Sequence, residues 1–517
     1  MANQTRVVVR KVADVAQSDL EVAIIGSGFA GLGMGIALRQ RGETRFAIFE
    51  QAKGLGGTWR DNHYPGAGCD VPSPLYSFSF EPNPDWTRLY SGQAEILAYL
   101  EHCARKYELA PHLRFGQGLA HAAFDETRGH WVLELTTGQT VTARVLVSGM
   151  GGLSRPAIPA LPGLERFEGV TFHSAQWRHD VPLEGKTVAV VGTGASAIQF
   201  VPRLQPLVKK LVLFQRTPPW ILPKADRAHG PLERALYRRV PAAQAALRRK
   251  IFWQHELRYF ALQNERLSAL GARLARAHLR RQVKDPALRA RLTPDYRLGC
   301  KRVLLSNDYF PAVASPNVEL VTQGIDSVTG TGVRTRDGQE HAVDAIVLGT
   351  GFRATDLFTP LTLRGLGGVD LNDAWRGGLE AYRGTTVAGF PNLFFLVGPN
   401  TGLGHNSMIL MIEAQIRYVL GALDALREGQ LAWLDVKPAA QATYNAQLQA
   451  RLGGSVWASG CSSWYHDAQG RNTTLWPGTT LEFSRLLARF DVEAYARQPR
   501  PLELVPAPLR QAAGGAR

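Results

Sequence analysis

Two glycine-rich turns constrain the fold of this chain more than any other feature. Each follows a short apolar run and precedes a helical segment: Gly26-Ser27-Gly28-Phe29-Ala30-Gly31 and Gly192-Thr193-Gly194-Ala195-Ser196-Ala197. In such a turn the first glycine permits the tight bend. The second lets the backbone approach a pyrophosphate, and the third small residue lets helix and strand pack closely. The sequence therefore predicts an α/β protein with two Rossmann-like dinucleotide-binding domains.

The residues at the ends of the next strands distinguish the two nucleotides. Glu50 lies 19 positions after Gly31, where a carboxylate accepts a hydrogen bond from an unphosphorylated ribose, as in FAD or NAD. Arg216 lies 19 positions after Ala197 and is followed by Thr217. An arginine there pairs with a 2′-phosphate, although a simple surface arginine is the alternative. We therefore expect FAD in the first domain and NADPH in the second, with hydride passing from nicotinamide to flavin.

The length of 517 residues suits two or three domains. Apolar strand-like runs, the proline-rich linker 155–163 and an Ala/Leu/Arg-rich helical stretch set the expected boundaries. These are an N-terminal arm at 1–20, a first part of the FAD-binding domain at 21–153, an NADP-binding domain at 154–349 with a helical insertion at about 225–299, a second FAD-binding and C-terminal region at 350–496, and a disordered tail at 497–517.

The net charge of +15 is concentrated in one segment. Residues 221–300 hold 18 Lys/Arg and 6 Asp/Glu. Such a segment suits nucleic acid, an anionic membrane surface, or solvated helices beside a phosphate-bearing cofactor. We favour the last, because no nucleic-acid motif accompanies the charge. No apolar run reaches the ~18 residues of a membrane span, and residues 1–20 lack a signal peptide. We therefore expect a cytoplasmic protein without an integral membrane segment.

Four scattered cysteines limit the chemistry. Cys69, Cys103, Cys300 and Cys461 form no C-x-x-C pair and no metal-ligand spacing. This pattern argues against a disulfide scaffold, a metal site and a disulfide reductase, and favours a reducing cytosol. A flavin monooxygenase remains, in which a fixed cation would steady an anionic peroxide.

Three motifs carry a resemblance to a known family. Residues 167–177 match F-x-G-x-x-x-H-x-x-x-W through Phe167, Gly169, His173 and Trp177. A second signature is matched by residues 56–59, 64–66 and Asp70, and a strand-end motif by residues 349–352. From about Glu21 to Trp476 the chain resembles the type I Baeyer–Villiger monooxygenases, which are class B flavoprotein monooxygenases. Arg178 departs from the Pro or Asp that usually follows the fingerprint tryptophan.

The resemblance implies an activity. It implies NADPH- and O2-dependent conversion of ketones to esters or lactones through a C4a-peroxyflavin. Linear, cyclic and aryl ketones all fit, and the oligomeric state is open. One alternative is a flavin-containing monooxygenase that oxygenates amines or sulfides. A remote alternative is a non-catalytic basic binding module.

The resemblance also implies residue roles. Arg302 is expected to steady the peroxide, Asp70 to pair with Arg302, and Lys301 to bind the NADPH 2′-phosphate beside Arg216. Trp464 is expected to fold over NADP, while His173 and Trp177 couple the domains; packing alone is the alternative for Trp464. The expected FAD contacts are Gly26, Gly28, Gly31, Glu50, Gly57, Thr58, Trp59, Asp70, Tyr76 and Met408. The expected NADP contacts are Gly192, Thr193, Gly194, Ala195, Ser196, Arg216, Thr217, Lys301 and Trp464.

Overall fold

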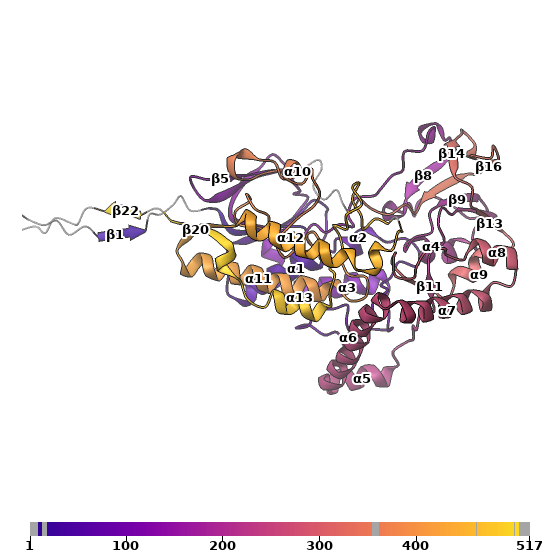
Figure 1. Cartoon of the computed structure of the whole chain (residues 1–517), viewed down its shortest axis with the longest axis horizontal. Coiled ribbons are helices and arrows are strands. Elements are labelled where there is room, and N and C mark those ends of the chain that lie inside the picture. Colours follow the sequence, from indigo (N-terminus) through magenta and orange to yellow (C-terminus); the bar gives the residue numbers. More distant parts are fainter. Residues whose placement is uncertain (1–8, 13–17, 354–360, 462, 501, 506–517) are drawn as a thin grey trace, which may run out of the picture.

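A mixed sheet of eight strands organises the first unit of the chain (Figure 1). The computed structural model describes residues 9–12, 18–353, 361–461, 463–500 and 502–505. The strand order is β18-β5-β6-β7-β2-β3-β4, and β19 pairs in parallel with the second half of β7. The strands are β2 (Leu20–Ile25), β3 (Phe46–Glu50), β4 (Leu113–Phe115), β5 (Leu119–Asp125), β6 (His130–Leu135), β7 (Thr140–Ser148), β18 (Thr362–Arg364) and β19 (Leu393–Phe395).

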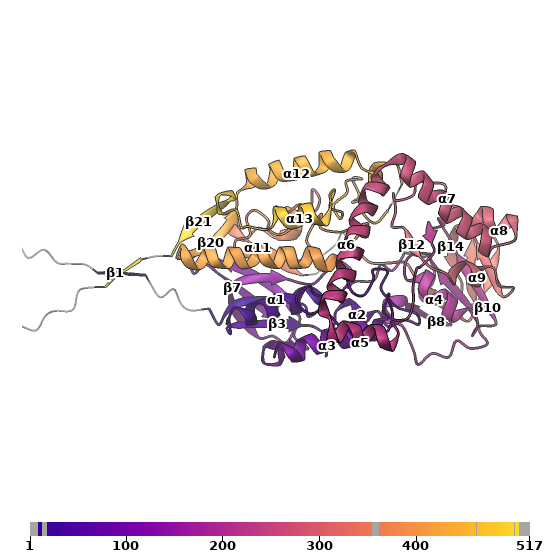
Figure 2. The same ribbon diagram turned by 90° about the horizontal axis from the view of Figure 1, so that it is seen from below.

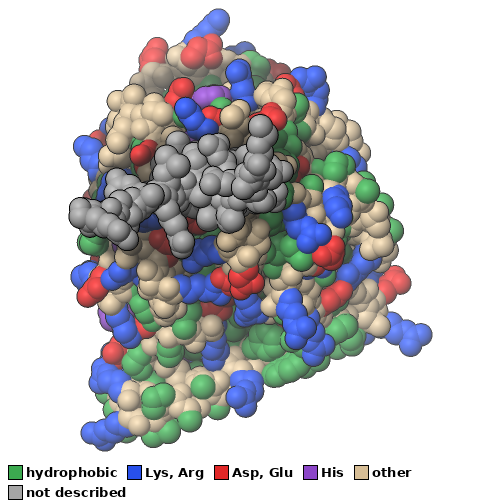
Figure 3. Space-filling model, turned by 90° about the vertical axis from the view of Figure 1, so that its left-hand side faces the viewer, with side chains coloured by type: hydrophobic (Ala, Val, Ile, Leu, Met, Phe, Trp, Pro, Cys, Tyr) green, Lys and Arg blue, Asp and Glu red, His purple; other side chains and the backbone are tan. Residues whose placement is uncertain are grey.

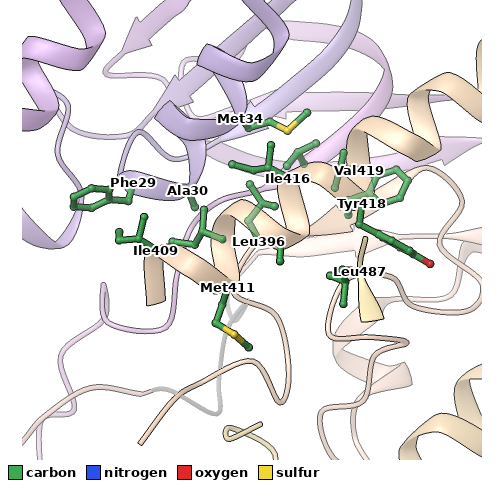
Figure 4. Packing of buried hydrophobic residues seen from close by; sticks show 14 of the residues in the cluster. Phe29, Ala30, Met34, Leu396, Ile409, Met411, Ile416, Tyr418, Val419 and Leu487 are labelled. Atoms are coloured by element: carbon green, nitrogen blue, oxygen red, sulfur yellow. The ribbon is translucent and has the colours of Figure 1, made fainter. Parts of the chain in front are cut away.

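Two helices pack together on one face of this sheet. Helix α1 (Phe29–Gln40) lies between the sheet and α11 (Met408–Glu428), so residues far apart in sequence share one core (Figure 4). Glycines make the close packing possible. A Cβ added at Gly33 would lie 3.0 Å from Ile416 of α11, and one at Gly35 would lie 2.7 Å from Ile48 of β3. The C-terminal part of the chain thereby completes the first unit.

A five-stranded parallel sheet organises the second unit. Its order is β13-β10-β9-β17-β8. Helices α4 (Ala197–Leu204) and α9 (Tyr309–Val313) pack on it, and a small antiparallel meander follows β13. The strands are β8 (Val170–His173), β9 (Thr187–Val191), β10 (Lys210–Phe214), β13 (Val318–Val321), β17 (Ala345–Leu348) and the meander β14 (Ile325–Val328), β15 (Gly332–Thr335) and β16 (Glu340–Ala342). The two parallel βαβ starts confirm the α/β class with two Rossmann-like units.

The basic segment forms four helices, and α5 to α7 cross in front of the molecule in Figure 2. They are α5 (Pro231–Arg239), α6 (Pro241–Gln263), α7 (Glu265–Gln282) and α8 (Pro286–Arg291). Helix α6 packs against the core of the first unit through Ile251, whereas α7 and α8 pack against the second unit through Leu279 and Leu288. Exposed apolar side chains such as Trp253 and Leu257 lie among these cations. Figure 3 shows hydrophobic and basic side chains gathered over its lower part, at the level of α5 and α6. None of the described helices is both long and apolar enough to cross a membrane.

The chain termini depart from expectation. Strand β21 (Tyr495–Pro499) pairs with β20 (Leu431–Val436), and β22 (Leu502–Val505) pairs with β1 (Val9–Val12). The prediction of a disordered tail from residue 497 is therefore wrong for these strands, because each finds a partner strand distant in sequence. The rest of that prediction, residues 506–517, lies outside the described residues.

Candidate active site

The first glycine turn closes tightly on the neighbouring strand. Gly26 has φ +97°, and a Cβ there would lie 2.8 Å from the Gly149 carbonyl oxygen. A Cβ on Gly31 would lie 1.8 Å from the Gly26 oxygen, so neither position accepts a side chain. Gly57 faces the turn, because its Cβ would lie 3.1 Å from the Gly28 Cα. No side chain caps α1, so its first N–H groups are available to a pyrophosphate.

Glu50 is held against the same turn. Its Oε2 accepts hydrogen bonds from the Ser27 backbone N–H at 3.0 Å and from the Ser27 hydroxyl at 2.8 Å. Its Oε1 accepts from Ala52 N–H at 2.9 Å and lies 3.2 Å from Arg60 Nη1. The carboxylate is thus buried beside the turn. In Rossmann-like folds an acidic residue at the end of this strand faces the ribose of the dinucleotide.

The second glycine turn is equally tight, and positively charged side chains lie near it in place of a carboxylate. Gly192 has φ +110°, and a Cβ there would lie 2.4 Å from the Gly349 oxygen. The Thr193 hydroxyl donates to the Thr217 carbonyl at 3.2 Å, which ties the turn to the end of β10. Helix α4 also lacks a side-chain cap. Glycine spacing, free helix N–H groups and the neighbouring cations fit a phosphorylated dinucleotide.

Lys301 and Arg216 lie close enough for their positive charges to repel each other. Partial burial lowers the pKa of Lys301, and the charge of Arg216 lowers it further. The Lys301 ammonium also lies 4.8 Å from the centre of the Tyr296 ring. Two cations that repel each other are stabilised by a shared anion, and a phosphate group supplies one.

Arg302 and Asp70 form a bidentate ion pair. Arg302 Nε donates to Asp70 Oδ2 at 3.0 Å, and Nη2 donates to Oδ1 at 2.8 Å and to Oδ2 at 2.7 Å. Arg302 Nη1 donates to the Leu403 carbonyl at 3.4 Å. Burial opposes ionisation of Asp70, but the charge and hydrogen bonds of Arg302 hold its pKa below the usual value. The carboxylate in turn raises the pKa of Arg302.

Side chains that sequence reasoning missed surround this pair. Burial raises the pKa of Tyr465 to about 12, and the charges of Arg302 and Asp70 act on the same phenol. Lys224 is close enough to Asp70 to help lower its pKa, and its ammonium lies 5.1 Å from the Tyr90 ring. These three residues lie in three separate segments, and no motif in the sequence marks them.

The second signature also joins the two units. The Tyr64 hydroxyl donates to Gln199 Oε1 of α4 at 2.8 Å, and Gln199 Nε2 donates to the Gly68 carbonyl at 2.9 Å. A Cβ on Gly66 would lie 2.6 Å from the Gln199 carbonyl oxygen. The signature therefore fixes the nucleotide helix of the second unit against the segment that leads to Asp70.

The fingerprint residues lie on and around β8, the edge strand of the second sheet. His173 ends β8, accepts a hydrogen bond from Ala175 N–H at 3.1 Å through Nδ1, and has a pKa lowered by burial. Trp177 is buried against Phe172 and Phe200. A Cβ on Gly169 would lie 2.4 Å from the Asp344 oxygen and 2.7 Å from the Phe167 ring. These contacts support a structural role for the fingerprint.

The exposed Arg178 pairs with Asp180, with 2.8 Å between Nε and Oδ1. Its charge is therefore satisfied locally, two residues along the chain. The unusual residue after the fingerprint tryptophan makes no contact with the Arg302–Asp70 pair among the described residues.

The other predicted residues lie near the first turn, at the start of α11 and in the loop after Cys461. Trp59 Nε1 donates to the Tyr76 hydroxyl at 3.1 Å, and Thr58 begins the short helix α2 (Thr58–Asp61) beside the first turn. Met408 begins α11 and packs against the core of the first unit. Trp464 is 47% exposed and lies against Tyr465, with 4.6 Å between the ring centroids.

The cysteines contradict the sequence interpretation. Cys300 and Cys461 form a disulfide across 161 residues of sequence, while Cys69 and Cys103 are free and buried. The scattered spacing argued against a disulfide scaffold, and it did not reveal this bond because sequence spacing does not report which distant loops meet. Within the described part of the chain, no cluster of three or more His, Cys, Asp or Glu side chains is arranged to hold a metal ion.

Comparisons with known proteins place this geometry in a family. Residues 19–359 match the model of the flavin-binding monooxygenase-like family. Proteins named Baeyer–Villiger monooxygenase from Pseudomonas aeruginosa and Streptomyces coelicolor are 52% and 50% identical to the chain. They align with 96% and 94% of it and with 94% of their own lengths.

Solved structures show the same architecture. An oxidised steroid monooxygenase bound to NADP matches with a TM-score of 0.83 at 31% identity, covering 92% of this chain and 99% of its own. Cyclohexanone monooxygenase from Rhodococcus, bound to NADP+, matches with a TM-score of 0.83 at 28% identity, covering 94% and 100%. The chain therefore belongs to the flavin-binding monooxygenase-like family, and within it to the Baeyer–Villiger monooxygenases, as the sequence resemblance implied.

Proposed function

We propose that Arg302 and Asp70 form the reaction centre of this protein, an FAD- and NADPH-dependent Baeyer–Villiger monooxygenase that converts ketones to esters or lactones. The observation that carries this proposal is the position of two consecutive cations. Lys301 lies close enough to Arg216 of the second unit for their charges to interact, whereas Arg302 forms its ion pair with Asp70 of the first unit. One short segment thus serves both nucleotide-binding units.

Arg302 supplies a permanent positive charge. When bound, NADPH supplies hydride and reduced FAD supplies the reaction with O2. A guanidinium remains charged at any working pH, so it stabilises negative charge that develops on reacting oxygen atoms. Asp70 occupies Nε and Nη2, which leaves Nη1, with its one long bond to Leu403, as the donor for the reacting atoms.

Asp70 acts as a positioning residue in this proposal. Two oxygens of one carboxylate hold the planar guanidinium in a single orientation, as bidentate pairs do. Because the pKa of Asp70 is lowered, the carboxylate is ionised at neutral pH and neither donates nor takes a proton in the reaction. Asp70 therefore orients the Arg302 guanidinium and performs no acid–base step.

We also propose the division of the nucleotide sites. Residues 21–153 with 350–496 bind FAD, where Glu50 lies beside the first turn, and residues 154–349 bind NADPH. Arg216, Thr217 and Lys301 bind its 2′-phosphate end. Trp464 lies on an exposed loop and covers the nicotinamide side. The buried Glu50 carboxylate at the first turn, and the neighbouring cations Arg216 and Lys301 in the second unit, support this assignment.

The test is product analysis with isotopic oxygen. Purified holoenzyme is incubated with NADPH, ¹⁸O2 and linear, cyclic or aryl ketones. We expect an ester or lactone carrying one ¹⁸O atom, with one NADPH consumed per product. Unchanged ketones together with efficient oxygenation of amines or sulfides would contradict the proposal and favour the flavin-containing monooxygenase activity.

A further inference from the structure

The Cys300–Cys461 disulfide joins the two segments that border the candidate active site. Cys300 is fully buried and directly precedes Lys301 and Arg302. Cys461 is partly exposed and lies three positions before Trp464. The two Cα atoms are 6.1 Å apart, although 161 residues separate them in sequence. A covalent bond thus connects the arginine segment to the C-terminal loop.

The loop after Cys461 contributes directly to the surroundings of Arg302. Tyr465 is 1% exposed, and its phenol is close enough to Arg302 and Asp70 for both charges to act on its pKa. Trp464, its neighbour, is 47% exposed. The loop therefore has one side chain anchored next to the ion pair and one facing outward, and the disulfide is a covalent attachment at its beginning.

We propose that Cys300–Cys461 is a redox-sensitive positioning cross-link. As a disulfide it holds the loop bearing Trp464 and Tyr465 against the segment bearing Lys301 and Arg302. Its reduction by a dithiol releases the loop. This inference rests on the proposed role of Arg302, and it assigns to the two cysteines a function that the ketone oxidation itself does not require.

The exchange is chemically complete with a dithiol as reductant. A thiolate of the dithiol attacks the Sγ of Cys461, the less buried of the two residues, forms a mixed disulfide and expels the Cys300 thiolate, which takes up a proton. The second thiol of the reagent then closes a cyclic disulfide and releases the Cys461 thiol. Two electrons and two protons pass to the protein, and the dithiol becomes a disulfide.

Release of the loop has a specific functional consequence. The Arg302–Asp70 pair does not depend on the disulfide for its three close hydrogen-bond contacts, so the cation stays in place. What is lost is the fixed cover over the site, which excludes water from the reaction. We therefore expect NADPH to be consumed at an undiminished rate while less of it yields ester.

The first experiment establishes the bond and its effect on the loop. In denatured but unreduced protein, mass spectrometry after alkylation should find two reactive thiols, Cys69 and Cys103, and four after treatment with dithiothreitol. Amide hydrogen exchange of the native holoenzyme should then be about tenfold faster in residues 463–466 after reduction. Four reactive thiols in untreated protein, or unchanged exchange, would overturn the proposal.

The second experiment measures coupling, the moles of ester formed per mole of NADPH consumed. We expect at least a threefold fall in coupling for the reduced wild type and for Cys461→Ser, with the anaerobic flavin reduction rate unchanged. Dithiothreitol should have no further effect on Cys461→Ser. Ser459→Ala, two positions before Cys461, keeps the bond and should keep wild-type coupling. Equal coupling in oxidised and reduced wild type would overturn the inference, whereas absence of ester from the oxidised protein would instead contradict the proposed function.

Discussion

Replacement of Asp70 by asparagine tests how the guanidinium is held. The amide keeps the shape of the carboxylate but removes its charge, and its NH2 group cannot accept from Arg302. The native pair has one Nε contact at 3.0 Å and two Nη2 contacts at 2.8 and 2.7 Å. In Asp70→Asn at most the contacts to one oxygen survive, and they are no longer bonds between two charged groups.

The expected magnitude follows from these contacts. The surviving contacts still have the charged guanidinium as donor, so the difference between aspartate and asparagine is about one lost bond to a charged group, which contributes about 1.5–3 kcal/mol. The side chains of Arg302 and Asp70 are 31% and 27% exposed, so solvent screening reduces the difference. A loss of about 1–2 kcal/mol in transition-state stabilisation is reasonable, and it corresponds to a roughly 5- to 30-fold fall in kcat/KM for ester formation.

The assay compares two steps in one variant. Ester formation at varied ketone concentration gives kcat/KM, and anaerobic stopped-flow mixing with NADPH gives the flavin reduction rate. The reduction rate should stay within about twofold of wild type, because Asp70 does not contact the proposed NADPH phosphate site. Asp180→Asn, which removes the surface partner of Arg178, is the matched control. Wild-type ester formation in Asp70→Asn, or an equal loss in both steps, would refute the reasoning.

Three further predictions follow from other contacts. Arg216→Ala should lower the NADPH/NADH ratio of kcat/KM by about 10- to 100-fold, since it removes a charge-assisted phosphate contact; an unchanged ratio would show that the phosphate binds elsewhere. Gly169→Ala should lower stability by about 1–3 kcal/mol, because its Cβ would lie 2.4 Å from the Asp344 oxygen. Gly54→Ala, where a Cβ meets nothing within 4 Å, should leave thermal unfolding unchanged, and equal Tm shifts would contradict this. Finally, the lowered pKa of Asp70 means that its contribution is complete above the ordinary aspartate value near 4 and is lost only as pH falls through the lowered pKa. No inflection from Asp70 is expected in ester formation between pH 5 and 8, and one that disappears in Asp70→Asn would be inconsistent with the ion pair.

Local patterns predicted the nucleotide-binding elements well. The two glycine turns, Glu50 and Arg216 can be read from spacing because each βαβ start is a continuous segment of about 30 residues. Strands β2 and β9 precede the two turns, and helices α1 and α4 follow them, as the sequence predicted. The pairing of Arg302 with Asp70 was expected only from family resemblance. No local pattern relates residues 232 positions apart.

The features that sequence reasoning missed all depend on distant partners. Strand β8 joins the second sheet only through β17, which follows it by about 170 residues. The disulfide joins Cys300 to Cys461, and Tyr465 reaches the ion pair from the same distant loop. The terminal strands β21 and β22 exist because β20 and β1 offer free edges. Each of these contacts forms between segments that are distant in sequence, so local propensity does not predict it.

The most direct test of the central role of Arg302 is Arg302→Ala. The flavin reduction rate with NADPH and the rate of ester formation from a ketone are measured on the same preparation, with the surface variant Arg178→Ala as control. We expect reduction within a few-fold of wild type and a fall in ester formation of at least about 10²- to 10³-fold, the usual cost of removing a fixed electrostatic stabiliser. Ester formation at the wild-type rate in Arg302→Ala would contradict this role.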